Sequence, residues 1–164
     1  MHNCVHVSLD AALAHKELAY VFEREAAPYT GVFTRCSAVV IQPHAVAAHA
    51  AGPILDALLA AGFEVSALRS IVLSRKDVTD YLEAYRGVYP EYEHWVAELS
   101  SGPAIVAEVR GEDVVPAVRE LAGPFDPEIA RALRPTTLRA KFGDTAVRNA
   151  LHVTDLERDG PLEC

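Results

Sequence analysis

Residues 138–163 read LRAKFGDTAVRNALHVTDLERDGPLE, and this stretch decides how the fold is assigned. It gathers polar residues around the apolar run ALHV, namely Arg139, Arg148, Asn149, His152 and Glu163. An arginine guanidinium presents a fork of N–H donors that suits phosphate or carboxylate oxygens. A histidine beside such donors can act as base, nucleophile or proton shuttle near neutral pH. A surface strand with scattered polar residues is the alternative, and the stretch alone does not exclude it.

The beginning of the chain repeats the pattern of this stretch, because NCVHVSLD near the start matches NALHVTDL near the end. In both copies an asparagine precedes the histidine by three residues, and a hydroxyl residue follows it by two. A glutamate follows each histidine by eleven residues. The two sets are Asn3, His6, Ser8 and Glu17, and Asn149, His152, Thr154 and Glu163. This fixed spacing predicts an internal repeat, so we interpret residues 1–25 as the tail of an upstream copy of the domain.

Composition limits the classes of function. The chain has 164 residues, of which 51% are hydrophobic and 23% charged, which is typical of a folded domain with its own core. Its net charge of -8 disfavours non-specific binding to nucleic acid or to an anionic membrane, so we expect neither partner. No apolar run approaches the roughly 20 residues that span a bilayer, and the start lacks a signal-peptide pattern. Cys4, Cys36 and Cys164 fit neither a disulfide framework nor a zinc-ligand spacing, which predicts a reducing, cytoplasmic location.

Periodicity predicts alternating strands and helices. Strands are expected at residues 36–42, 64–73, 104–110 and 147–153. Helices are expected at residues 52–63, in two patterns within 75–99, and at 112–123, and an ordered loop with a short helix is expected at 123–142. This order predicts an α/β fold of the α+β sandwich type. It is the ferredoxin-like βαββαβ plan, with a four-stranded antiparallel sheet and helices packed on it.

With these elements in order, the chain resembles the nucleoside diphosphate kinase family over residues 36–163. The motifs SGP, VVPAVRELAG, TLRAKFG and RNALHVTD occur in the family's order and approximate spacing. The loop GPFDPEIARALRP is longer than in housekeeping members. Together with the repeat at the start, it resembles the second kinase-like domain of a multi-domain ciliary branch. The implied domains are a kinase-like remnant at 1–25, a linker at 26–34 and a kinase-like domain at 35–164.

The resemblance implies transfer of a phosphoryl group from ATP to nucleoside diphosphates through a phosphohistidine. It implies His152 as the phosphorylated residue. Glu163 matches the carboxylate that orients the other ring nitrogen, and Thr154 matches a hydroxyl that bridges this pair. Mg²⁺ would be bound through the nucleotide phosphates and not by protein ligands.

Further positions match the family's nucleotide contacts. Arg119 and Arg139 match the residues that bind phosphates, and Asn149 matches the residue that contacts the ribose. Tyr89 or Tyr92 would supply the ring that stacks on the base. His44 and His49 lie in the loop after the first strand. Their motif contains no cysteine or carboxylate partner, so we do not expect a metal site there.

Three positions depart from the family. Gln42 stands where the family has a lysine that reaches sugar and phosphate oxygens. The loss of a charge-assisted hydrogen bond would slow transfer by ~10–100-fold. Phe125 replaces a threonine that contacts phosphate, and Thr136 stands at the position of a turn glycine. Because the sequence ends at Cys164, we also expect a weaker hold on Glu163.

Two hypotheses follow. The first is a nucleoside diphosphate kinase domain with weakened activity. The second is a catalytically weak or inactive structural module of ciliary axonemal microtubules, with tubulin or other axonemal proteins as partners. In either case the domain could pair with an upstream kinase-like domain of the same chain. Trp95 is expected in the core or in an interface.

Overall fold

The computed structural model describes residues 6–23 and 30–164, which belong to two compact units divided after Thr30. The first unit contains α1 (Ala11–Leu18) and a π-helical turn (Ala19–Glu23). The Asp10 carboxylate begins α1 by accepting the N–H of Leu13 at 2.8 Å, as an N-cap does. Part of the predicted linker and Asn3 of the predicted repeat lie outside the described residues.

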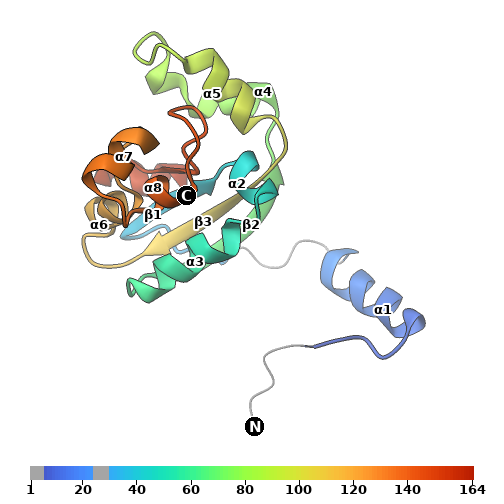
Figure 1. The fold of residues 1–164 in the computed structure, drawn as a ribbon. Helices are drawn as coiled ribbons and strands as arrows, with labels where there is room; N and C mark the ends of the chain where they lie inside the picture. The colour runs from blue at the N-terminus through green and yellow to red at the C-terminus, as the bar shows by residue number, and fades with distance from the viewer. Residues whose placement is uncertain (1–5, 24–29) are drawn as a thin grey trace. The chain divides into compact units, whose positions relative to one another are not determined.

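The second unit is built on a four-stranded antiparallel sheet (Figure 1). Its strands are β1 (Cys36–Ile41), β2 (Glu64–Val72), β3 (Pro103–Arg110) and β4 (Leu151–Val153), in the spatial order β2-β3-β1-β4. Every neighbouring pair is antiparallel. This confirms the predicted ferredoxin-like plan.

Short helices surround this sheet. They are α2 (Pro43–Ala47), α3 (Ala51–Ala60), α4 (Arg75–Tyr81), α5 (Tyr92–Leu99), α6 (Val114–Ala122), α7 (Pro127–Leu133), α8 (Leu138–Phe142) and α9 (Gly160–Glu163). Two 3₁₀ turns, Glu83–Tyr85 and Glu157–Asp159, complete the unit. Helices α4 and α5 lie together at one end of the unit (Figure 1).

The central strand β1 is buried along its whole length and contributes to two hydrophobic clusters. Val39 and Ile41 belong to the cluster that contains residues of α3 and α6. Val40 belongs to the cluster that contains Trp95 and other residues of α4 and α5. Successive side chains of a strand point to opposite faces, so both faces of β1 are covered.

The register of β4 places His152 on the second of these faces. His152 is the antiparallel partner of Val40, and directly opposed residues of two strands share a face of the sheet. His152 therefore points toward the cluster that contains Trp95. Its neighbours Leu151 and Val153 belong to the other cluster.

Two sequence predictions about the elements were wrong in detail. The strand predicted at residues 147–153 begins only at Leu151, because Ala150 has a φ of 75° and interrupts the extended backbone. The region predicted as a loop with one short helix contains both α7 and α8. Asp126 caps the start of α7 by accepting the N–H of Glu128 at 2.8 Å.

Two residues of the predicted linker are bound to the second unit. The backbone N–H of Val32 donates to Glu108 Oε2 at 2.8 Å, and that of Phe33 donates to Oε1 at 2.6 Å. The unit thus includes residues before β1. Within the described part of the chain, no helix has the length and apolar character needed to cross a membrane.

Candidate functional site

His152 lies in a buried aromatic cage. Its side chain is only 4% exposed, and its ring centroid lies 5.5 Å from those of Tyr81 and Trp95 and 6.0 Å from that of Tyr85. Burial, together with the smaller effect of the charges of Arg139 and Arg119, lowers the pKa of His152 from 6.5 to about 3. The imidazole is therefore neutral at physiological pH, which is the nucleophilic form.

Glu163 of α9 faces this ring. Its Oε2 lies 4.0 Å from His152 Nε2, which is beyond hydrogen-bond distance. The Thr154 hydroxyl donates to Glu163 Oε2 at 2.9 Å and accepts the N–H of Ala38 at 2.9 Å. The Tyr81 hydroxyl donates to the same carboxylate at 3.5 Å, and burial raises the pKa of Glu163.

These bonds refine the predicted role of Thr154. Its described hydrogen bonds join Glu163 to β1, so the hydroxyl holds the carboxylate in place and does not bridge to the histidine ring. Glu163 is half-buried and bonded although the sequence ends one residue later. The expected weak hold on this carboxylate is thus not what the structure shows.

The first unit contains the same arrangement of residue types. His6 Nε2 lies 2.9 Å from Glu17 Oε1, and the Ser8 hydroxyl donates to the other oxygen of Glu17. The pKa of Glu17 is lowered by the hydrogen bonds from Ser8 and His6. The repeat seen in the sequence therefore recurs as a histidine, hydroxyl and glutamate in contact, while the interpretation as an upstream domain stays a prediction.

Arg139 is held rigidly beside the strand that carries His152. Its guanidinium donates to the Leu151 carbonyl at 3.2 and 3.3 Å and to the Gly123 carbonyl at 2.8 Å. The same group lies over the Phe125 ring, 5.5 Å from its centroid. Burial lowers the pKa of Arg139 to about 10, so the side chain stays charged at neutral pH. A buried cation of this kind is suited to an anionic ligand.

Arg119 of α6 lies close enough for its charge to lower the pKa of His152, and it pairs with Asp155. Asp155 also accepts a hydrogen bond from the Tyr85 hydroxyl. The sequence prediction missed Asp155, although it directly follows Thr154 in the motif HVTD. Because it neutralises Arg119, Asp155 competes with any phosphate that binds this arginine.

Three fully buried side chains carry polar atoms without a hydrogen-bond partner among the described residues. They are Gln42 Oε1, Asn149 Oδ1 and Trp95 Nε1. Gln42 Nε2 donates to the Val147 carbonyl at 3.3 Å, and Asn149 Nδ2 donates to the Phe125 carbonyl at 3.3 Å. An unpartnered buried polar group costs about 1–3 kcal/mol. A polar ligand or water would remove this cost.

The Phe125 ring is partly buried and packs against the aromatic cluster around Trp95. It lies edge-on to Tyr89 at 5.1 Å and to Trp95 at 5.6 Å between ring centroids. Tyr92 is buried, and its hydroxyl donates to the Thr79 carbonyl at 3.4 Å. Of the two tyrosines considered for base stacking, Tyr89 is therefore the one placed at the aromatic cluster.

The structure also defines the surroundings of four further residues, Trp95, His44, Arg148 and Thr136. The predicted core position of Trp95 is borne out by its 1% exposure, but its contact with His152 was not predicted. His44 Nδ1 bonds Glu98 Oε1 at 2.9 Å, and the Arg148 guanidinium donates to Oε2 of the same carboxylate at 3.0 Å. Thr136 is exposed and is not among the described residues with positive φ, so no glycine is required there.

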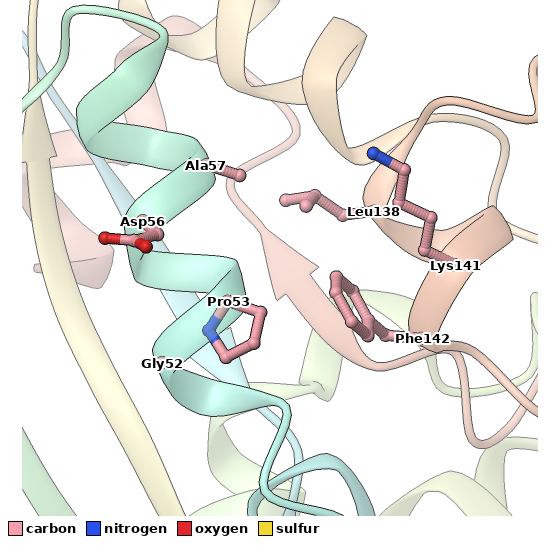
Figure 2. Close-up of a pocket in the computed structure, with 7 residues that line it drawn as sticks. All are labelled: Gly52, Pro53, Asp56, Ala57, Leu138, Lys141 and Phe142. Carbon is pink, nitrogen blue, oxygen red and sulfur yellow. The ribbon is translucent and has the colours of Figure 1, made fainter.

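Two surface pockets lie next to these elements. One, of about 600 Å³, lies between α3 and α8, where Pro53, Asp56 and Ala57 face Leu138 and Phe142 (Figure 2). None of the predicted site residues lines it. The other, of about 670 Å³, includes Arg119 and Asp155 and continues to Arg158. It leads from solvent to the ion pair at the edge of the site.

The family model described as "Nucleoside diphosphate kinase" matches residues 35–164, which carry all the site residues described above except those of the first unit. The chain belongs to the nucleoside diphosphate kinase family. It is 47% identical over 134 residues to "Nucleoside diphosphate kinase homolog 7" of Rattus norvegicus, which covers 82% of this chain and 34% of the relative. The chain thus spans about a third of the length of that relative.

Shorter members of the nucleoside diphosphate kinase family match nearly end to end. The chain is 34% identical over 125 residues to the "Nucleoside diphosphate kinase" of Aquifex aeolicus, covering 87% of it. A crystal structure of the Aquifex aeolicus enzyme has a TM-score of 0.75 at 32% identity, over 79% of this chain and 91% of that chain. The structure of nucleoside diphosphate kinase from Encephalitozoon cuniculi, at 21% identity and a TM-score of 0.72, shows the shared fold. Family membership supports phosphoryl transfer and nucleotide binding of this type.

Proposed function

We propose that the domain transfers a phosphoryl group from a nucleoside triphosphate to a nucleoside diphosphate through a phosphohistidine at His152. The observation that carries this proposal is the state of His152. The ring is buried, neutral with a pKa of about 3, and flanked by the charges of Arg119 and Arg139. Such a histidine is a nucleophile placed where an anionic phosphoryl group is attracted.

The two ring nitrogens have different roles in this proposal. Because Glu163 lies at Nε2, we assign the attack on phosphorus to Nδ1. The attack puts positive charge on the imidazole, which strengthens its attraction to the Glu163 carboxylate. A shift that closes the 4.0 Å separation to hydrogen-bond distance would then stabilise the phosphohistidine.

The surroundings of His152 fit a nucleotide that carries Mg²⁺ on its phosphates. Arg119 and Arg139 supply positive charge. The unpartnered polar atoms of Gln42, Asn149 and Trp95 are available to form hydrogen bonds with a nucleotide. Bound Mg²⁺ would neutralise phosphate charge as the phosphoryl group leaves. Arg139 and Arg119 would hold the phosphates in line with His152.

Weak activity is also part of the proposal. Arg119 must leave Asp155 before it binds phosphate, and Phe125 occupies space between Tyr89 and Arg139. Gln42 lacks the charge of a lysine, and its amide is directed to a backbone carbonyl. Each feature raises the cost of forming the complex with nucleotide.

Labelling with γ-³²P-ATP and Mg²⁺ tests the proposal. We expect acid-labile label on the protein that His152→Ala abolishes and that the exposed control His94→Ala retains. Transfer of this label to added nucleoside diphosphate would complete the cycle. Gln42→Lys should raise the labelling rate, by about 10-fold if the lost charge is the main deficit. Absence of label at high protein concentration would refute the kinase function.

A second candidate function is a structural module of ciliary axonemal microtubules, in the cytoplasm of the cilium. The observation in its favour is that both arginines of the site already have partners within the protein. Asp155 binds Arg119, and Phe125 packs on Arg139. In this proposal residues 1–25 end an upstream kinase-like domain that pairs with residues 35–164. Co-sedimentation with polymerised tubulin tests it. Binding that persists in His152→Ala supports a structural role, and a protein that stays in the supernatant contradicts it.

A further inference from the structure

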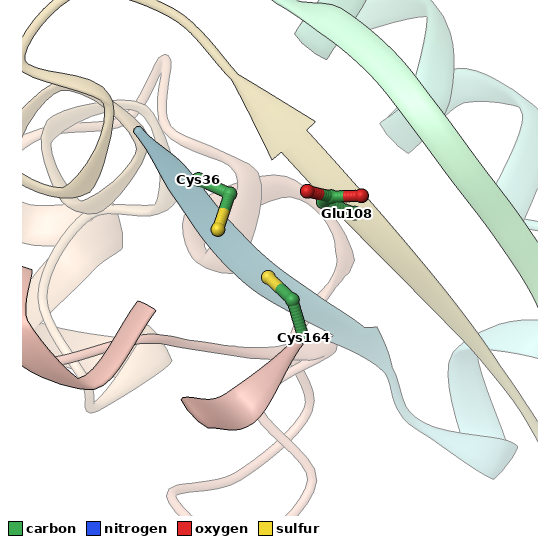
Figure 3. A group of neighbouring side chains, drawn as sticks. All are labelled: Cys36, Glu108 and Cys164. Atoms are coloured by element: carbon green, nitrogen blue, oxygen red, sulfur yellow. The ribbon is translucent and has the colours of Figure 1, made fainter. Parts of the chain in front are cut away.

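Two cysteines that are distant in the sequence meet at the edge of the sheet. Cys36 begins β1, and Cys164 directly follows α9. Their Sγ atoms and a carboxylate oxygen of Glu108 all lie within 4.8 Å of one another. Figure 3 shows the two sulfur atoms pointing toward each other, and the thiols share a hydrogen bond. They are not joined in a disulfide in this structure.

Close backbone packing of α9 against β1 holds the Cys36 and Cys164 thiols near each other. A Cβ atom added to Gly160 would lie 2.1 Å from the carbonyl oxygen of Cys36, so only a glycine lets α9 lie this close to β1. The N–H of Cys164 donates to the Gly160 carbonyl at 3.1 Å, which closes the last turn of the helix. The approach of the two thiols is therefore set by the backbone and not by flexible side chains.

We propose that Cys36 and Cys164 form a redox-active dithiol that a small disulfide, such as glutathione disulfide, converts into an intramolecular disulfide bond. Cys36 is 2% exposed and Cys164 is half-buried, so Cys164 meets the oxidant first. Its thiolate attacks one sulfur of the oxidant, forms a mixed disulfide and releases one glutathione thiolate. The Cys36 thiolate then attacks the Cys164 sulfur and releases the second. Two protein thiols are oxidised, and one glutathione disulfide is reduced to two glutathione thiols.

The same cluster could be considered a metal site, but the chemistry of Glu108 argues against it. Its two oxygens accept the backbone N–H groups of Val32 and Phe33. The carboxylate is thus engaged in holding the chain before β1. Two thiols remain, whereas a structural zinc site uses four protein ligands. Burial raises the pKa of both thiols, so their exchange with glutathione disulfide proceeds slowly, through the minor thiolate form.

The disulfide would fasten α9 to β1 at the point where the carboxylate beside His152 is held. Glu163 immediately precedes Cys164, and Ala38 of β1 anchors Thr154, which bonds Glu163. The closed loop spans almost the whole domain, so the crosslink removes much conformational freedom from the unfolded chain. The consequence for phosphoryl transfer rests on the proposed function, but formation of the crosslink does not.

The test uses the full chain with Cys4→Ser, which leaves only the two cysteines of the proposed pair. The folded protein is incubated with glutathione disulfide, alkylated with N-ethylmaleimide and analysed by mass spectrometry and thermal unfolding. We expect a mass lower by two hydrogen atoms, no alkylation, and a linked peptide that contains both cysteines. The Tm should rise by roughly 10 °C and return after treatment with dithiothreitol.

A matched variant with Cys164→Ser in the same background should show neither the mass loss nor the rise in Tm. Alkylation of both cysteines after oxidation, or a mixed disulfide with glutathione that persists, would overturn the proposal. Stoichiometric Zn²⁺ binding that blocks the crosslink would overturn it in favour of a metal site. His152 labelling keeps the two proposals apart, because a crosslinked protein without label refutes only the kinase function. A labelled protein that never crosslinks refutes only the dithiol.

Discussion

The protonation state of His152 makes a prediction about stability as a function of pH. The pKa of His152 is 6.5 in the unfolded chain and about 3 in the folded protein. Above pH ~6.5 neither state binds the proton, so His152 adds no dependence on pH. Between the two pKa values only the unfolded chain binds the proton, so the folded state loses stability as pH falls. Each pH unit in this window costs about 1.4 kcal/mol.

Between pH ~7 and pH ~5 the expected loss from His152 is therefore about 2 kcal/mol of unfolding free energy. Urea unfolding at both pH values measures it in the wild type and in His152→Leu. The variant should lose about 2 kcal/mol less than the wild type over this interval, because leucine binds no proton. The difference between the two losses cancels the contributions of the other histidines.

His94→Gln is the matched control, since His94 lies exposed on α5. We expect it to lose as much stability as the wild type. Equal losses in the wild type and His152→Leu would refute the reasoning, because the buried ring would then gain its proton as readily in the folded state. Burial would then not keep His152 in its neutral, nucleophilic form.

Three further predictions concern packing around the site. Glu108→Ala should lower the free energy of unfolding by about 2 kcal/mol, because two backbone N–H groups lose their acceptor; an unchanged urea midpoint would contradict this. Gly160→Ala should cost about 1–3 kcal/mol, since the new methyl would meet the Cys36 carbonyl, and should slow His152 labelling. A Tm equal to that of the wild type would show that α9 does not lie against β1. Phe125→Thr should raise the labelling rate on the order of tenfold by uncovering the Arg139 guanidinium, and a slower rate would mean that the ring supports the site.

The strands β1, β2 and β3 could be predicted to within a few residues. Each is a run whose own apolar or alternating side chains indicate an extended, half-buried or buried backbone. Strand β4 could not, because the sequence ALHV gives no sign that Ala150 adopts a positive φ. The helix α8 was missed for a similar reason, since Thr137 and the proline before it suggest a turn while packing selects a helix.

The residues of the candidate site were likewise predicted only in part from the sequence. His152, Glu163, Thr154 and Arg139 lie together in the folded chain, while the roles that the family resemblance implies for them stay predictions. Asp155 was missed because a carboxylate in a loop has no sequence signal for the arginine that it binds.

The sequence by itself determined the family, the ferredoxin-like plan and the residue types of the site, because these depend on local periodicity and on motifs at fixed spacing. Only the tertiary structure decided that His152 is neutral and that Cys36 and Cys164 are in contact. Burial, charge and contact between distant segments are properties of the folded chain. A pKa is set by solvent exclusion and by neighbouring charges that arrive from other elements, and no local pattern of residues contains them.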